Sequence, residues 1–267
     1  MPGCLLKLVL LTYFYENQLI SMSIMSRVGD SLFGKKETDP APAYDQWSET
    51  YDQQPGNLIL DLDEVIFSIF LEEIDVAGTT IVDIGCGTGR HWKRLLDKNP
   101  KQLTGFDISQ GMLDKLKEKF PDARVFRSDG IGLAGMNNNA VDLVISTLTV
   151  AHIKNIEEAL VEWNRVLKPG GGIIITDYHP DLLVKGAKRT FRYNNRTVIV
   201  KNHVHSIETL QRLARQLHWT ELRFIRRIID DSVKEYYERQ NALSLFEKFM
   251  GTPVIYGIHL KKEHDPA

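Results

Sequence analysis

Residues 81–91 read IVDIGCGTGRH, an apolar run that ends in three closely spaced glycines, Gly85, Gly87 and Gly89. An apolar run followed by glycines is typical of a buried strand that turns into a helix. Glycine adopts backbone angles that other residues avoid, and it lets a ligand approach the main chain closely. The helix that follows offers free N–H groups to an anion. The stretch therefore indicates a ligand-binding turn, with a tight turn that binds no ligand as the alternative.

The chain on both sides of this turn alternates between short apolar runs and segments with helical spacing. We expect helices at 57–76, 90–99, 110–120, 155–167, 207–217 and 233–250. We expect strands at 79–86, 102–109, 123–129, 141–150, 168–180, 222–229 and 253–262, and a hairpin at 190–206 that turns near Asn194 and Asn195. Strands that alternate with helices predict an α/β, doubly wound, Rossmann-like sheet with helices on both faces.

The N-terminal residues differ from the rest of the chain. Residues 5–14 are nearly all apolar, but a bilayer span needs about 20 such residues, and the segment that follows is polar and contains prolines. We interpret 1–43 as a disordered tail and linker, with Met22 and Met25 as alternative starts, and 44–267 as one domain with a hairpin insertion at about 180–205. A membrane or targeting role for the first residues is the alternative.

Composition excludes some classes of function. The chain is 43% hydrophobic and 25% charged, with a net charge of −2, so it has no general positive field to attract nucleic acid. Its two cysteines, Cys4 and Cys86, do not form the framework of a disulfide-rich protein. We therefore expect a reducing, cytoplasmic setting, no nucleic-acid partner and no stable insertion into a membrane. The sequence predicts no particular oligomeric state.

Three kinds of ligand compete for the glycine turn. A P-loop requires a lysine after its last glycine, and none follows here. A dinucleotide fingerprint requires GxGxxG, whereas Gly89 comes one position early and Arg90 stands in the expected place. The segment from Asp83 to Gly89 resembles DxGxGxG, motif I of class I S-adenosylmethionine-dependent methyltransferases, and in particular the small-molecule enzymes of the type 11 group.

Further motifs resemble this family in the same order along the chain. Asp107 ends a predicted strand about 20 residues after the glycines, the spacing of an acid that accepts from both ribose hydroxyls. STLTVAHI at 146–153 and RVLKPGG at 165–171 match the segments after the fourth strand and before the fifth. The resemblance implies a seven-stranded, mostly parallel sheet with an antiparallel last strand. It also implies a site for S-adenosyl-L-methionine made of Tyr51, Asp83, Gly85, Cys86, Gly87, Gly89, Asp107, Ile108, Met112, Asp129, Gly130, Ser146 and Leu148.

Histidines near the predicted strand ends are candidates for a general base. His152 follows the fourth strand and His179 the fifth, and an unperturbed imidazole titrates close to neutral pH. A hydrogen-bonded structural role is the alternative for each. The histidines and Asp177 match no metal-ligand spacing, so we expect no metal. Tyr44, Trp47 and Tyr51 either line a substrate pocket or simply pack.

The acceptor is expected to be a small molecule. Enzymes that methylate DNA bases commonly carry Asn/Asp-Pro-Pro-aromatic after the fourth strand, and this chain has STLT there. The arginines at 212, 215, 223, 226 and 227 are interpreted as a solvated face. Two other functions remain as alternatives. One is a nicotinamide-dependent oxidoreductase, and the other is a protein that binds S-adenosylmethionine without catalysis.

Overall fold

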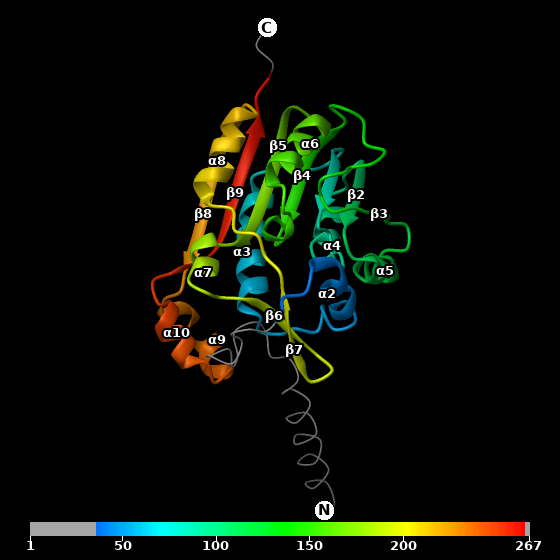
Figure 1. Cartoon of the computed structure of the whole chain (residues 1–267). Helices are drawn as coiled ribbons and strands as arrows, with labels where there is room; N and C mark the ends of the chain where they lie inside the picture. The colour runs from blue at the N-terminus through cyan, green and yellow to red at the C-terminus, as the bar shows by residue number, and fades with distance from the viewer. Residues whose placement is uncertain (1–35, 265–267) are drawn as a thin grey trace, which may run out of the picture.

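A seven-stranded sheet forms the centre of the computed structural model, which describes residues 36–264 (Figure 1). The order of the strands is β3-β2-β1-β4-β5-β9-β8, and β9 runs antiparallel to both of its neighbours. The other adjacent pairs are parallel, as the doubly wound prediction requires. The strands are β1 Thr80–Ile84, β2 Gln102–Asp107, β3 Arg124–Arg127, β4 Val141–Thr147, β5 Leu167–Tyr178, β8 Trp219–Ile228 and β9 Pro253–Lys262. The predicted fold class, including the antiparallel last strand, is confirmed.

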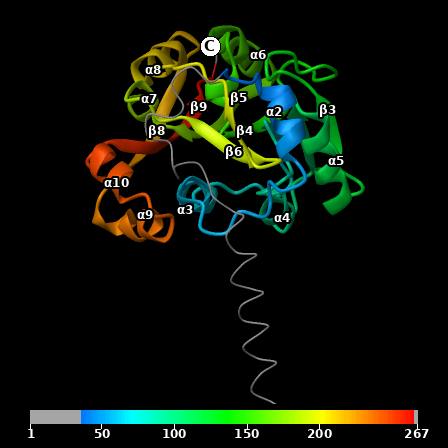
Figure 2. The same cartoon turned by 60° about the horizontal axis from the view of Figure 1, so that its bottom comes forward.

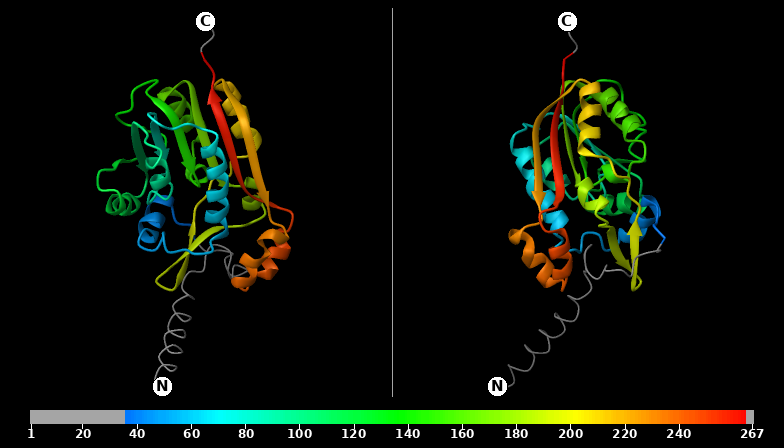
Figure 3. Two further views of the ribbon diagram at one scale, coloured as in Figure 1. Left: turned by 180° about the vertical axis from the view of Figure 1, so that it is seen from behind. Right: turned by 60° about the vertical axis from the view of Figure 1, so that its left-hand side comes forward.

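Helices cover both faces of the sheet, and successive residues of each strand face opposite cores (Figure 3). Ile81 of β1 packs in the core with α3, α4 and α5, whereas Val82 packs in the core with α6 and α8. The helices are α3 Leu58–Glu72, α4 Trp92–Leu96, α5 Gln110–Lys119, α6 Ile156–Val166 and α8 Ile207–Gln216. Asn57 starts α3, because its side chain accepts hydrogen bonds from the first free N–H groups of the helix.

The expected hairpin is present and lies across the carboxyl ends of the strands. Figure 2 brings this end forward and shows β6 Arg189–Tyr193 crossing it, with α2 Pro40–Trp47 alongside. The turn to β7 Arg196–Val200 uses left-handed backbone at Asn194 and Asn195, with φ of 46° and 58°. Short helix α7 Pro180–Val184 leads into the hairpin.

The folded part of the chain begins earlier than the predicted boundary at residue 44. Residue 44 falls inside α2, and the N–H of Thr38 already donates to the carbonyl of Ile199 in β7 at 2.8 Å. The ring of Trp47 in α2 stacks on the ring of Phe191 in β6, with 4.5 Å between centroids. Long-range contacts with the hairpin thus order a stretch that composition alone indicated as linker. The tail predicted for residues 1–35 lies outside the described residues.

Several predicted elements are shorter than expected, and one is divided. The helix expected at 233–250 is two helices, α9 Lys234–Arg239 and α10 Leu243–Phe249, because Asn241 takes a left-handed φ of 51° between them. The helix expected at 90–99 is reduced to α4. The fourth strand ends at Thr147, where Leu148 has a φ of 55° and a 3₁₀ turn follows. In residues 36–264, every helix is too short or too polar to span a bilayer.

Candidate active site

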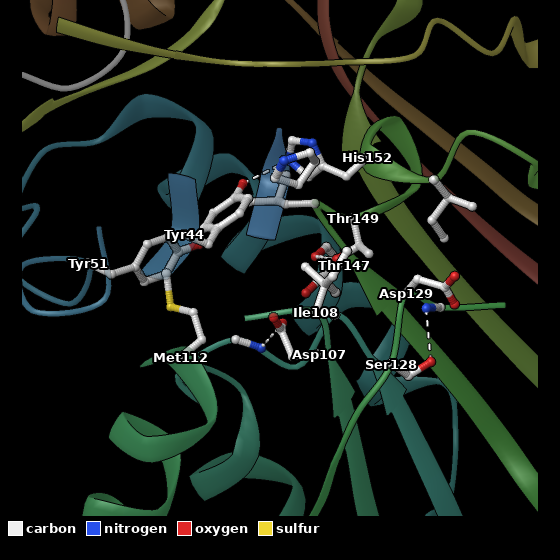
Figure 4. A pocket seen from close by; sticks show the side chains of 16 residues that line it. Tyr44, Tyr51, Asp107, Ile108, Met112, Ser128, Asp129, Thr147, Thr149 and His152 are labelled. Carbon is white, nitrogen blue, oxygen red and sulfur yellow. Dashed lines mark hydrogen bonds between the residues drawn. The ribbon is translucent and has the colours of Figure 1, made fainter. Parts of the chain in front are cut away.

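A cavity with about 600 Å³ of empty space opens at the carboxyl ends of the strands (Figure 4). It lies where the strand order reverses between β1 and β4, the usual position of ligands in doubly wound sheets. Its walls are Pro40, Tyr44, Tyr51, Gly85, Gly87, Asp107, Ile108, Met112, Ser128, Asp129, Gly130, Thr147, Leu148, Thr149, His152 and Ile153.

The glycine turn forms the floor of this cavity. Gly85, Gly87 and Gly89 have φ of 74°, 53° and 76°, which explains why the turn uses glycine at each position. A Cβ atom at Gly85 would lie 1.9 Å from Oγ1 of Thr149, so a side chain has no room there. The N–H of Gly85 donates to the carbonyl of Phe106 at 2.7 Å and ties the turn to β2. The main chain of the turn is therefore open to a ligand on its cavity side.

Asp107 ends β2 beside the turn, and the backbone fixes the orientation of its carboxylate. Oδ2 accepts from the N–H of Gly87 at 2.8 Å, and Oδ1 accepts from the N–H of Ser109 at 2.8 Å. Burial raises the pKa of Asp107 to about 6, although these two N–H groups oppose the rise. Each carboxylate oxygen has a further lone pair, so the group can also accept from a pair of ligand hydroxyls.

The loop after β3 supplies the opposite wall. Figure 4 shows Ser128 and Asp129 across the cavity from Tyr51 and Met112. Oδ1 of Asp129 accepts from the N–H of Ile131 at 3.0 Å, which closes a local turn and leaves an exposed side chain at the cavity. The carbonyl of Gly130 accepts from the indole N–H of Trp163 at 2.8 Å. The loop is therefore anchored to α6, and its acid is among the residues that line the cavity.

Five of the predicted residues do not line the cavity. Asp83 is buried beneath the turn, where Oδ2 accepts from the indole N–H of Trp92 at 2.8 Å, and burial raises its pKa to about 6. Cys86, Gly89 and Ser146 are also outside the lining. Nδ1 of His179 accepts from the N–H of Asp181 at 3.3 Å and caps α7, outside the lining of the cavity. The predicted residues that do line the cavity are Tyr51, Gly85, Gly87, Asp107, Ile108, Met112, Asp129, Gly130, Leu148 and His152.

His152 borders the cavity as a neutral imidazole. Its Nδ1 lies 3.1 Å from the carbonyl of Lys201, and because a carbonyl only accepts, Nδ1 carries the proton. Its Nε2 then accepts from the hydroxyl of Tyr44 at 2.8 Å and from the guanidinium of Arg189. Burial and the charge of Arg189 hold the pKa of His152 well below its usual range. His152 is thus held neutral, and the lone pair of its Nε2 is directed at Tyr44 and Arg189.

The sequence interpretation did not include Arg189, the first residue of β6. Arg189 is 2% exposed, and its Nη2 donates to Oδ1 of Asp177 in β5 at 2.8 Å. Its Nη1 donates to the carbonyl of Leu148 at 2.8 Å. The ion pair connects the hairpin to the end of the sheet above His152. Within residues 36–264, no group of three or more His, Cys, Asp or Glu side chains is arranged to hold a metal ion.

Comparison with known proteins identifies the domain that carries this cavity. Residues 82–175 match the family model described as a methyltransferase domain, and this stretch runs from β1 to β5 and includes the glycine turn. Residues 82–175 therefore resemble a methyltransferase domain. A curated relative, an uncharacterised methyltransferase of Geobacillus kaustophilus, is 30% identical over 139 residues. That match covers 51% of this chain and 62% of the relative, so this chain spans about three fifths of the relative's length.

Solved structures share the fold of the methyltransferase domain. An S-adenosylmethionine-dependent methyltransferase from Mesorhizobium loti superposes with a TM-score of 0.57 at 18% identity, over 71% of this chain and 93% of that one. A [4+2]-cyclase superposes with a TM-score of 0.59 at 18% identity, over 86% of this chain and all of the other. Since one of these proteins is described as a cyclase, the fold by itself does not fix the reaction.

Proposed function

We propose that this protein transfers a methyl group from S-adenosyl-L-methionine to a small-molecule acceptor. The observation that carries the proposal is a single cavity in which the glycine turn, Asp107 and Asp129 come together. The residues fit the cofactor chemically, because Gly85 and Gly87 open the main chain to its methionine part and Asp107 accepts from its ribose hydroxyls. Ile108, Met112 and Ile153 supply the apolar contact that an adenine ring needs.

The bound cofactor supplies a methyl group already activated by a sulfonium. The residues of this chain orient the acceptor and exclude water, and such positioning supplies most of the rate in a displacement of this kind. The rings of Tyr44 and Tyr51 cover the cavity from the N-terminal segment. Nε2 of His152 accepts a hydrogen bond from the Tyr44 hydroxyl, which fixes the Tyr44 ring at the cavity.

A small acceptor suits the enclosed position of the site. STLT, in place of Asn/Asp-Pro-Pro-aromatic, continues to argue against methylation of a flipped base. A screen of metabolites with an isotopically labelled methyl donor, read by mass spectrometry, should give at least one labelled product. Cofactor binding without transfer to any metabolite would instead favour the non-catalytic alternative.

Asp107→Ala tests the cofactor site directly. We expect the affinity for S-adenosylmethionine to fall at least about tenfold, the scale of a hydrogen bond to a charged group. Isothermal titration calorimetry measures the change, and Asp114→Ala, on the exposed side of α5, is the matched control. Unchanged affinity in a folded Asp107→Ala protein would show that the assignment is wrong. Wild-type protein that binds NADH and not S-adenosylmethionine would support the oxidoreductase alternative.

The raised pKa of Asp107 predicts that cofactor binding weakens in acid. The ionised carboxylate accepts from the ligand, so affinity should fall as pH drops through about 6 and be about tenfold lower at pH 5 than at pH 7.5. Without ligand, the stability of the fold depends on pH in the opposite direction. Because the folded-state pKa lies above the ordinary 3.8, the protein becomes less stable as pH rises from about 4 to about 6. Calorimetry at each pH therefore measures the affinity separately from stability. Asp107→Asn should remove most of the pH dependence of the affinity.

A further inference from the structure

A second, smaller cavity adjoins the cofactor cavity. It has about 250 Å³ of empty space, open solvent included, and shares Tyr44, Tyr51 and Leu148 with the larger one. Trp47, Tyr178 and Arg189 are among the residues of its other walls. The two cavities meet beneath α2 and the hairpin, so a molecule in the smaller cavity would lie next to the cofactor site. This position suits one end of a methyl acceptor.

Two buried hydrogen-bond donors on residues that line this smaller cavity lack partners among residues 36–264. They are Nε of Arg189 and the hydroxyl of Tyr178, whose side chains are 2% and 3% exposed. The two side chains are in contact, with the guanidinium 4.3 Å from the centre of the Tyr178 ring. Buried polar groups are nearly always paired, so two unpaired donors side by side indicate a missing acceptor. The other nitrogens of Arg189 already donate to Asp177, Leu148 and Tyr44.

We propose that the smaller cavity receives a carboxylate of the methyl acceptor, to which Arg189 donates through Nε and Tyr178 through its hydroxyl. The proposal rests on the proposed function, because it names the class of acceptor for the same site. A carboxylate has two oxygens that match two donors, of which one is cationic. Asp177 already offsets the charge of Arg189, which favours a single negative charge over a doubly charged phosphate. The rings of Trp47 and Tyr51 provide an apolar surface for the rest of the acid.

Tyr178→Phe tests the proposal without disturbing the ion pair of Arg189. The substitution removes only a hydroxyl that has no partner in the described part of the chain, so the melting temperature should stay the same or rise. Tyr237→Phe is the matched control. Tyr237 is also buried with an unpaired hydroxyl, but it lies in α9 and packs against Phe246, away from both cavities.

The measurement uses the full chain and three pairs of probes: acetate and acetamide, hexanoate and hexanamide, benzoate and benzamide. Calorimetry follows each probe with and without saturating S-adenosylhomocysteine. We expect at least one acid to bind at least tenfold more tightly than its amide, and Tyr178→Phe, unlike Tyr237→Phe, to weaken that acid about tenfold. Equal binding of acids and amides, no binding of any acid, or no effect of Tyr178→Phe would overturn the proposal. A protein that binds the acids but not the S-adenosyl compounds would contradict the proposed function alone.

Discussion

Replacing Asp63 by alanine is expected to lower the free energy of unfolding by about 3–5 kcal/mol, the usual cost of removing one partner from a buried ionic network. Asp63 lies in α3 with no exposed surface, and its carboxylate accepts from Arg90, His91 and Thr176. Burial opposes ionisation of this carboxyl, but Arg90 and His91 outweigh it and hold the pKa of Asp63 well below its usual range. The substitution would leave the guanidinium of Arg90 without its closest counter-charge.

The position of Asp63 gives this loss a functional consequence. Arg90 and His91 follow the glycine turn directly, and Thr176 belongs to β5, so one carboxylate connects α3, the turn and the centre of the sheet. We expect cofactor affinity to fall together with stability.

Urea unfolding followed by circular dichroism measures the effect of Asp63→Ala. The matched control is Asp61→Ala on the same helix, where an exposed carboxylate accepts from the hydroxyl of Tyr236 at 2.9 Å. Asp61→Ala should lower the free energy of unfolding by no more than about 1 kcal/mol, as expected for the loss of an exposed hydrogen bond. If Asp63→Ala unfolds at the same urea concentration as Asp61→Ala, the network does not support the turn.

The fold was predictable because its signals are local. Each central strand is a short apolar run, and the caps of α3 and α5, Asn57 and Ser109, directly precede helical spacing. The differences occur where tertiary contacts decide the backbone. Asn241 divides α9 from α10, and Leu148 ends β4 early, each with a left-handed φ that no sequence pattern predicts.

The sequence predicted only those residues of the candidate site that lie at the carboxyl ends of the parallel strands. Gly85 directly follows β1, Asp107 ends β2, and Asp129 lies two residues beyond β3. The carboxyl ends of parallel strands meet at one edge of the sheet. Arg189 gave no such signal, because its burial depends on a hairpin that folds back over the sheet to reach Asp177. Tyr178 has the pattern of an ordinary core residue, and only the packed structure shows that its hydroxyl lacks a partner among residues 36–264.

Gly85→Ala should also destabilise the protein strongly, by about 2–5 kcal/mol, as the sum of two costs. A left-handed backbone costs a non-glycine residue about 1–2 kcal/mol, and overpacking costs about 1–3 kcal/mol. The new Cβ would lie 1.9 Å from Oγ1, 2.5 Å from Cγ2 and 2.6 Å from Cβ of Thr149. Because the Cβ atom of Thr149 is itself too close, rotation of its side chain cannot relieve the overlap, and either the turn or the 3₁₀ segment after β4 must move.

Gly87→Ala separates the two costs. Gly87 also has a left-handed φ, of 53°, but a Cβ atom there would meet nothing within 4 Å. This variant should therefore lose only the stability that a left-handed backbone costs a non-glycine residue. Thermal unfolding should therefore show a loss several-fold larger for Gly85→Ala than for Gly87→Ala. The double variant Gly85→Ala with Thr149→Gly removes the overlapping side chain and should recover part of the difference. If both single variants melt at the same temperature, close approach to Thr149 is not what requires glycine at position 85.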